Sequence, residues 1–411
     1  MTNTVPEIRG RGPGNSLRMA FISSVVSLMA AFAAAGAAIP LFNLYRAEDG
    51  FTNADISMAI VSYSAATLAT LLVLGRLSSY LGRRPTSIAG LVLLLGGCLL
   101  LLGVHDVGVL ILSRLLMGFG AGLASSSLSA YIIDTAPAQP PWLAPVASSQ
   151  TVMLGLAVGT VSSGALVQFA PWPRQLIFLV VITLLLISVA LLAFSPETVN
   201  RTAGVWRSLA PRVQVPKRVR SLVPVAAAVL LATWAAGAFY QAFVPALVEN
   251  QLHTHSPLIV GVVFAAYMGA SVLGAPLNAR LTAATAQRTS MVAFFAGMAG
   301  IVGAIATGSL MLFVASTLVS GASQGVAISA TTRSLLYGSN AADRAPTFSV
   351  IYLLSYSGAT IPALIAGQLS EHISLPQIAI GYSALAFAGA AFTLFTAPTS
   401  DIKPDMEHPV Q

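Results

Sequence analysis

One arginine of this chain lies where a charge is costly. Arg114 falls inside an apolar run from residue 108 to residue 133, six residues from its start, which places it roughly 9 Å along a helix. If this run crosses a membrane, a buried charge costs several kcal/mol unless it is paired or faces water. A long arginine side chain can also reach the headgroups from that depth. Arg114 is therefore the first candidate for binding or moving a charged group.

The carboxylates, in contrast, avoid the apolar runs. All thirteen Asp and Glu residues fall in loops, in tails or at the ends of these runs. A site that exchanges protons needs a group whose protonation changes with its exposure. By position, the candidates are Asp55 and Glu249 near one set of loops and Asp134 near the other. Imidazoles can titrate near neutral pH, but four of the five histidines fall where exposed loops are expected, at His105, His253, His255 and His372.

No pattern of ionisable residues indicates an enzyme. The apolar runs hold no constellation of His, Asp, Glu and Cys that could form a nucleophile–base pair or a metal site, which are the features that such chemistry requires. The chain also lacks the Gly-x-x-x-x-Gly-Lys-Ser/Thr stretch that cradles nucleotide phosphates. We therefore expect no catalytic residue, no bound metal and no cofactor.

Amide and aromatic side chains inside the apolar runs are candidates for lining a substrate pathway. In hydrocarbon these polar groups need partners, so they face protein or water. An apolar pocket with few polar groups suits a neutral or amphipathic small molecule better than a highly charged one. Each residue can also bond to a neighbouring helix, and about a third are expected to touch substrate. The candidates are Asn43, Tyr63, Gln150, Trp234, Tyr240, Gln241, Tyr267, Gln324, Tyr352 and Tyr356.

The composition identifies the solvent of the protein as lipid. Of the 411 residues, 56% are hydrophobic and 8% are charged, with a mean hydropathy of +0.82, whereas soluble domains carry about 25% charged residues. The net charge of +7 would suggest nucleic acid in a soluble protein; here it indicates orientation in a membrane, and we expect no nucleic-acid partner. Cys98 is the single cysteine, so no disulfide forms within the chain.

Apolar length predicts twelve membrane spans, since a helix needs about 20 mostly apolar residues to cross. The break at residues 307–309 is the weakest, because no charge separates the two runs that flank it. The first run is too long for the core of a cleavable signal peptide. The spans are expected at 19–45, 56–75, 88–104, 108–133, 144–169, 175–195, 222–248, 258–279, 290–306, 310–332, 346–370 and 377–397.

Basic residues predict the orientation of these spans. With the N-terminus inside, seventeen of the twenty Lys and Arg residues fall on the inner side; Arg46 and Arg174 fall outside and Arg114 within a span. Basic residues near span ends set orientation, so both termini are expected to be cytoplasmic. The expected domains are an N-terminal tail (1–18), a six-helix bundle (19–195), a basic linker (196–221), a second six-helix bundle (222–397) and a C-terminal tail (398–411).

The two halves also repeat a few residues at matching places. Gly155 and Gly164 recur 203 positions later as Gly358 and Gly367. Pro40, near the end of the first run, has a counterpart in Pro245 near the end of the seventh. Two six-helix halves related by internal symmetry, with a site between them near the midplane, are a recurrent transporter architecture.

The turn from Gly75 to Pro85 reads Gly-Arg-Leu-Ser-Ser-Tyr-Leu-Gly-Arg-Arg-Pro. Through Gly75, Gly82, Arg83 and Arg84 it resembles the loop between the second and third helices of major facilitator superfamily transporters. Ser79 stands where the family has an acid, and Tyr80 where it has an arginine.

In the family the missing acid belongs to a charge network that holds the cytoplasmic ends of the halves together. We expect Arg83 or Arg84 to pair with Asp134 instead; the alternative is that both arginines only contact anionic lipid headgroups.

The resemblance extends to two other helices. Arg114 occupies the place of the family's fourth-helix arginine. The stretch with Gly155, Gly159 and Gly164 resembles the fifth-helix motif of the family's antiporters, with Thr160 and Ser163 at two positions that differ from it. A spacing of four residues places Gly155, Gly159 and Ser163 on one helix face, which permits close packing against a neighbouring helix. In the second half, Gly358 and Pro362 at the same spacing are expected to give a related bend.

The resemblance implies an all-α membrane protein with twelve transmembrane helices in two pseudo-symmetric halves, the major facilitator fold. It implies a secondary transporter that works by alternating access, similar to the bacterial drug/proton antiporter branch, exporting small organic compounds in exchange for protons from a bacterial inner membrane, as a monomer. Uptake of a small metabolite by symport or facilitated diffusion is the alternative, followed by a membrane sensor that does not transport.

Overall fold

The chain folds into helices in every part that the structure describes. This computed structural model describes residues 13–140, 142–202, 209, 215–278, 281–339 and 341–397, and the secondary structure in these ranges is α-helix with one short 3₁₀ turn. Twelve of the helical segments are long and apolar enough to cross a membrane. The expected all-α membrane fold with twelve spans is confirmed.

The first six spans are built from seven helices, with an eighth short helix in a turn. The helix α1 ends at a turn, and the short α2 completes the first span, while α4 forms part of the Gly75–Pro85 turn. Their bounds are α1 (Pro13–Ala37), α2 (Phe42–Asp49), α3 (Asn53–Val73), α4 (Ser78–Leu81), α5 (Arg83–Leu101), α6 (Val107–Thr135), α7 (Leu143–Phe169) and α8 (Leu176–Ala193).

The last six spans follow a short 3₁₀ turn, η1 (Lys217–Val219). The helix is interrupted at Phe243, between α10 and α11, so the expected continuous seventh span is two helices. The remaining elements are α10 (Val223–Ala242), α11 (Val244–Asn250), α12 (Pro257–Ser271), α13 (Gly274–Asn278), α14 (Ala283–Thr307), α15 (Leu310–Leu336), α16 (Ala341–Leu369) and α17 (Leu375–Thr396).

The turn between the ninth and tenth spans lies where the sequence predicted it. Gly308 closes α14 with a φ of 64°, and the Ser309 hydroxyl accepts the Leu312 N–H at the start of α15. The break expected at residues 307–309 is therefore present. Several helices begin earlier than expected, among them α1 at Pro13, α5 at Arg83, α14 at Ala283 and α16 at Ala341. The expected spans began after the charges at Arg83, Arg84 and Arg288, whereas the helices already include these residues.

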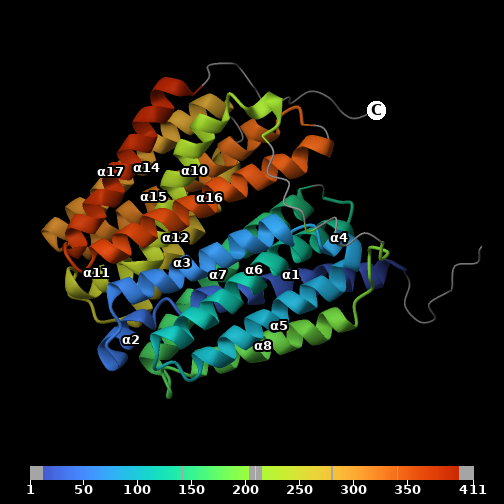
Figure 1. Ribbon diagram of the computed structural model, residues 1–411, viewed down its shortest axis with the longest axis horizontal. Helices are drawn as coiled ribbons and strands as arrows, with labels where there is room; N and C mark the ends of the chain where they lie inside the picture. Colours follow the sequence, from blue (N-terminus) through green and yellow to red (C-terminus); the bar gives the residue numbers. More distant parts are fainter. Residues whose placement is uncertain are drawn as a thin grey trace, which may run out of the picture.

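The two sets of six spans form two groups that meet at one end (Figure 1). There α7 packs against α12, and α3 packs against α16. The Ser57 hydroxyl donates to the Ala363 carbonyl at 2.9 Å, and the Gln168 amide oxygen accepts from Ser256 at 2.5 Å and from the Leu258 N–H at 3.3 Å. We call this the joined end. Toward the end that carries α4, the basic end, the ribbons of α3 and α16 diverge (Figure 1).

The break in the first span leaves backbone carbonyls that the helix does not satisfy. Pro40 has no N–H, and the Ile39 N–H bonds to Gly36 and the Leu41 N–H to Ala38. In a regular α-helix those two donors would serve the carbonyls of Ala35 and Ala37.

Side chains of neighbouring helices serve these carbonyls instead. Ser163 of α7 donates to the Ala37 carbonyl at 2.5 Å, and Arg114 of α6 donates to the Ala35 carbonyl at 3.2 Å. The break is thus stabilised by polar residues, as backbone inside a membrane requires.

Beside the break in the seventh span, backbone carbonyls also accept from polar side chains, but across the halves. Pro245 lies at the start of α11. Asn43 donates from its amide to the Pro245 carbonyl at 2.8 Å, and Arg46 donates to the Ala242 carbonyl at 2.9 Å. Arg46 also donates to the Asn43 amide oxygen at 2.8 Å. The expected correspondence between Pro40 and Pro245 is therefore a correspondence between two broken helices.

The repeated glycines occupy equivalent contacts in the two halves. A Cβ atom at Gly155 would lie 2.7 Å from the Met29 carbonyl oxygen of α1, and one at Gly358 would lie 2.7 Å from the Leu231 backbone of α10, so both allow close packing within a half. Across the halves, a Cβ atom at Gly164 would lie 2.5 Å from the Pro257 carbonyl oxygen, and one at Gly367 would lie 2.5 Å from the Ser57 Cβ. Pro362 lies inside α16, whose helix continues through it.

We predict that Gly164→Ala opens the joined end. Its Cβ would meet backbone of the other half at 2.5 Å, whereas a Cβ at Gly381, the control position, has nothing within 4 Å. An overpacked contact costs about 1–3 kcal/mol, so the open form should become about tenfold more populated. The measurement is the rate at which a maleimide labels Ser57→Cys, normally 1% exposed, in purified Cys98→Ser protein. Equal rates in Gly164→Ala and Gly381→Ala would contradict the assigned contact.

Candidate functional site

Arg114 is buried inside the first half. Its side chain is 1% exposed, so it lies within protein and not at the lipid-facing surface. The guanidinium donates through Nη1 to the Ala35 carbonyl, and its carbon lies 5.3 Å from the centre of the Phe42 ring. The Nε and Nη2 atoms are buried and have no partner in the described part of the chain. Reaching the headgroups, the alternative considered from the sequence, is excluded by this burial.

No carboxylate balances this charge in the region that the structure describes. The ionisable groups close enough to act on Arg114 electrostatically are the side chains of Tyr45, Tyr63 and Cys98. The Tyr45 hydroxyl is itself buried without a partner among the described residues. The first half therefore carries a positive charge that lies among neutral groups.

A second group of candidates lies between the halves. Trp234 of α10 contacts Tyr356 of α16 with ring centres 4.8 Å apart and planes tilted by 54°. Tyr63 of α3 and Tyr352 of α16 lie within electrostatic range of Tyr356. We call these four residues the aromatic cluster. The Trp234 indole N–H is buried without a partner among the described residues, so it is a donor that an added acceptor could use.

Three other pathway candidates form a bonded core inside the second half. Tyr240 stacks on Tyr267 with ring centres 3.9 Å apart. The Tyr240 hydroxyl donates to Thr317 at 2.9 Å, and the Tyr267 hydroxyl donates to the Gln324 amide oxygen at 2.7 Å. All three candidates are buried. Their contacts hold α10, α12 and α15 together, which is the helix-bonding alternative raised for these residues from the sequence.

The remaining pathway candidates lie away from the aromatic cluster. Asn43 bonds across the joined end, as described above. The Gln150 amide approaches the Ser149 hydroxyl at 3.4 Å, and the Gln241 amide approaches the Gly237 carbonyl of its own helix at 3.4 Å. Whether any of the ten touches substrate stays a prediction.

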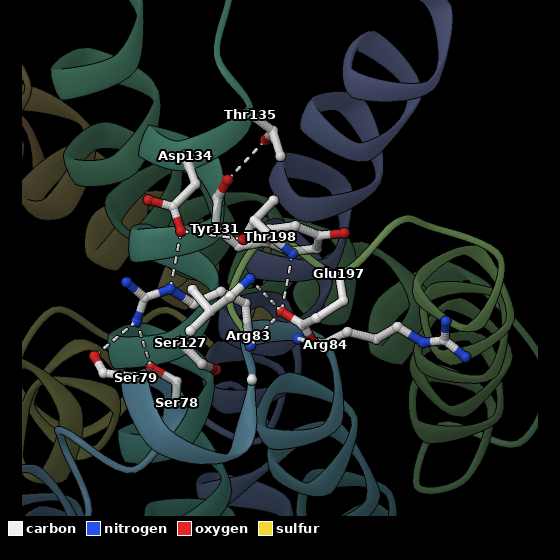
Figure 2. Close-up of polar contacts among 12 residues, drawn as sticks. Ser78, Ser79, Arg83, Arg84, Ser127, Tyr131, Asp134, Thr135, Glu197 and Thr198 are labelled. Atoms are coloured by element: carbon white, nitrogen blue, oxygen red, sulfur yellow. Dashed lines mark hydrogen bonds and ion pairs between the residues drawn. The ribbon is translucent and has the colours of Figure 1, made fainter. Parts of the chain in front are cut away.

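At the basic end, Arg83 pairs with Asp134. Its Nε donates to the Asp134 carboxylate at 2.9 Å, and its Nη1 donates to the hydroxyls of Ser78 at 2.8 Å and Ser79 at 3.2 Å (Figure 2). Ser79, which replaces an acid of the family motif, therefore accepts a hydrogen bond from the same arginine. The two side chains of the pair are 15% and 30% exposed, so the pair is screened in part by solvent.

Glu197 lies beside the Arg83–Asp134 pair and was not among the residues predicted from the sequence. Its carboxylate accepts the backbone N–H of Arg83 at 2.8 Å and of Arg84 at 3.0 Å, the first two residues of α5 (Figure 2). Helix N-termini have free N–H donors and a positive dipole end, so the segment after α8 caps α5 in place of a local residue. Gly82, with a φ of 106°, leaves room because a Cβ there would lie 2.5 Å from Glu197.

Two further contacts fix the segment after α8. Thr198 donates to the Asp134 carboxylate at 3.2 Å, and the Tyr131 hydroxyl donates to the Pro196 carbonyl. A signal was present in the sequence: Glu197 is an acid directly after an apolar span, on the side of a basic turn.

Of the expected inner-side basic residues, Arg9, Arg11, Arg207, Arg212, Arg280 and Lys403 lie outside the described residues.

The joined end carries its own charge cluster. Arg174 donates to Glu48 at 2.7 Å, to Asp49 at 2.5 Å and to the Val104 carbonyl. Burial alone would lower the pKa of Arg174, but its hydrogen bonds to Asp49 and Glu48 raise the pKa above the ordinary value. His105 lies 2.9 Å from Asp49 through Nδ1. These contacts tie α2 to the loops that follow α5 and α7.

The expected coupling acids have structural contacts. Asp55 caps α3, because its carboxylate accepts the Thr52 N–H at 2.8 Å while the Thr52 hydroxyl accepts the Asp55 N–H at 3.1 Å. Glu249 lies 3.4 Å from His255 and within electrostatic range of Arg46. A role of Asp55, Asp134 or Glu249 in coupling stays a prediction.

Across the described ranges, no three His, Cys, Asp or Glu residues gather as a metal site would require.

Comparisons with known proteins agree with this architecture. The model of a family described as Major Facilitator Superfamily matches residues 21–249, more than half of the chain. Monosaccharide-sensing protein 2 of Arabidopsis thaliana is 41% identical over 88 residues, which are 21% of this chain and 12% of that protein. Monosaccharide-sensing protein 1 of the same plant is 38% identical over 82 residues, 20% of this chain and 11% of that protein. The matches thus span only a small part of these curated relatives.

A solved structure matches over nearly the whole chain. The crystal structure of a single-substitution mutant of the nucleoside transporter NupG superposes with a TM-score of 0.72, covering 91% of this chain and 99% of that chain. The sequences are 14% identical, so the likeness shows a shared fold and leaves the ligand of this chain open.

We predict that Glu197→Ala weakens the basic end. Loss of a helix cap costs about 1 kcal/mol, so the midpoint of heat-induced unfolding in detergent should fall by about 1 °C. Glu197→Gln, which keeps one acceptor oxygen, should lose less. Glu371→Ala is the matched control, because this glutamate is exposed beyond the end of α16. Equal midpoints for Glu197→Ala and Glu371→Ala would refute the capping role.

Proposed function

The chain belongs to the Major Facilitator Superfamily, and from this premise we propose that it exports small neutral or amphipathic organic compounds by alternating access, in exchange for protons. The family and the nucleoside-transporter fold make it a transporter and not an enzyme. The observation that carries the proposed binding site is the aromatic cluster, in which Trp234, with its buried and unpartnered indole N–H, contacts Tyr356, and Tyr63 of the other half lies within electrostatic range of Tyr356.

The aromatic cluster suits a neutral or amphipathic substrate. Aromatic rings offer large apolar faces, and the Trp234 N–H and the tyrosine hydroxyls offer a few polar contacts. The cluster draws on α3, α10 and α16, so a bound molecule would contact both halves and respond to their relative movement. Binding between the halves is how alternating access exposes one site to each side in turn.

The contacts at the joined end support a state closed on that side. We assign the basic end to the cytoplasm, because basic residues near span ends favour the inner side and Arg18, Arg76, Arg83 and Arg84 lie at that end. The joined end would then face outward. Opening it must separate Asn43 and Arg46 from the carbonyls of α10 and α11.

The packing of α7 supports export, and one acid near the joined end supports proton exchange. The α7 glycines keep the close packing expected of the antiporter motif: a Cβ at Gly159 would lie 2.2 Å from the Ala33 carbonyl oxygen. For proton exchange, Glu249 is the acid beside the cross-half contacts of Arg46. Uptake of a small polar metabolite is the second candidate, because the curated relatives are named for monosaccharide sensing and the structural match for nucleoside transport.

Flux into inside-out vesicles separates these functions. We expect a transported compound to accumulate when the vesicle interior is acidified, and to lose that accumulation when a protonophore collapses the gradient. Indifference to the gradient would remove proton exchange. Accumulation that requires the opposite gradient would favour uptake by symport.

A conservative substitution tests the aromatic cluster. Trp234→Phe keeps a ring but removes the free N–H, and loss of one hydrogen bond to substrate should raise KM by about tenfold. Trp142→Phe is the control, because Trp142 is 60% exposed at the start of α7. An unchanged KM in Trp234→Phe, with wild-type amounts of folded protein, would remove the indole from the site.

A further inference from the structure

The free edge of Arg114 has the geometry of an anion receptor. One terminal nitrogen, Nη1, already bonds to the Ala35 carbonyl, and the Phe42 ring lies near the guanidinium carbon. The donors that remain, Nε and Nη2, are buried and unpartnered among the described residues. These two N–H groups lie on the same edge of the planar guanidinium, where they form a fork that matches a carboxylate.

A second free donor lies in the same region. The Tyr45 hydroxyl is buried and has no partner among the described residues, and Tyr45 is within electrostatic range of Arg114. Tyr45 is fully buried, so its hydroxyl, like the arginine fork, cannot be served by bulk water at the surface. A phenol O–H can donate to an anion beside an arginine fork.

The charge environment selects the sign of the ligand. Tyr45, Tyr63 and Cys98, the ionisable neighbours of Arg114 in the described chain, are all neutral when protonated. A buried positive charge without a carboxylate is strongly unfavourable in a membrane protein. A ligand with one negative charge would neutralise the guanidinium, whereas a neutral ligand would leave the charge uncompensated.

We propose that Arg114, with Tyr45, binds one small monovalent anion inside the first half of the protein. The anion is either an inorganic halide or the carboxylate of a transported compound, since both accept from the same donors. The inference deepens the proposed function, but only the carboxylate alternative rests on transport. An anion-binding site in the first half would complement the aromatic cluster, so that a substrate with a carboxylate and an apolar body could use both.

Equilibrium binding to purified protein in detergent tests the proposal. Labelled chloride and labelled benzoate are measured separately in a chloride-free sulfate buffer. We expect saturable binding of about one anion per chain for at least one probe, and at least tenfold weaker binding in Arg114→Gln. Arg333→Gln is the matched control, because both terminal nitrogens of Arg333 already donate, to Asn278 and to the Leu281 carbonyl, so its unpartnered Nε has no free neighbour with which to form a fork; its binding should equal the wild type.

The outcomes distinguish the sources of the anion. Chloride binding that benzoate does not displace assigns a halide site, and benzoate binding assigns the carboxylate of a substrate. If Arg114→Gln does not fold, Tyr45→Phe keeps the ring and should still weaken binding about fivefold. Absence of saturable binding of either probe to the wild type, or unchanged binding in the variants, overturns the proposal. Failure of transport with binding intact would count against the proposed function alone.

Discussion

The need to satisfy every backbone polar group inside lipid governs this structure. Two spans are broken, one beside Pro40 and one at Phe243 beside Pro245, and backbone carbonyls at a break inside a membrane need partners within the protein. The first break is served by Arg114 and Ser163 of neighbouring helices, and the second by Asn43 and Arg46 of the other half. Polar residues that would be costly elsewhere in the membrane are therefore placed where a helix cannot satisfy itself.

This constraint connects the fold to its movement. Bonds that serve the first break lie within one half, so they persist when the halves move relative to each other. Bonds that serve the second break cross between the halves, so they must be exchanged when the joined end opens. At that end Gly164 meets backbone of the other half and Gly367 meets the Ser57 side chain. At the basic end, Arg83 bonds to Asp134, and Glu197 caps α5. The joined end is thus held across the halves, while the cluster around Arg83 lies on one side of the molecule.

Much of the fold could be predicted from the sequence, because hydropathy and charge report directly on lipid. The twelve spans, the turn at residues 307–309 and the equivalence of the repeated glycines all follow from local composition or spacing. The predicted helix ends were less accurate than the predicted spans. A charge such as Arg288 interrupts the apolar run in the sequence, but α14 begins five residues earlier, at Ala283.

The site was harder to predict because it depends on which face of each helix meets which neighbour. Tyr63 and Tyr267 look alike in sequence, yet one lies beside the other half and the other is buried in its own. Glu197 was missed because its partners, the first N–H groups of α5, are more than a hundred residues away in sequence. The burial of Arg114 could be expected from its apolar surroundings, whereas its free Nε and Nη2 edge required coordinates.

The central claim is that the halves pivot, with the joined end and the basic end opening in turn. Distances between paired spin labels test it most directly, in Cys98→Ser protein in lipid nanodiscs. One pair replaces the exposed Leu81 and Tyr337 at the basic end, and the other replaces the exposed His105 and His255 at the joined end. The account predicts that a transported compound shifts the two distance distributions in opposite directions. Two distributions that stay fixed, or that move together, would contradict it.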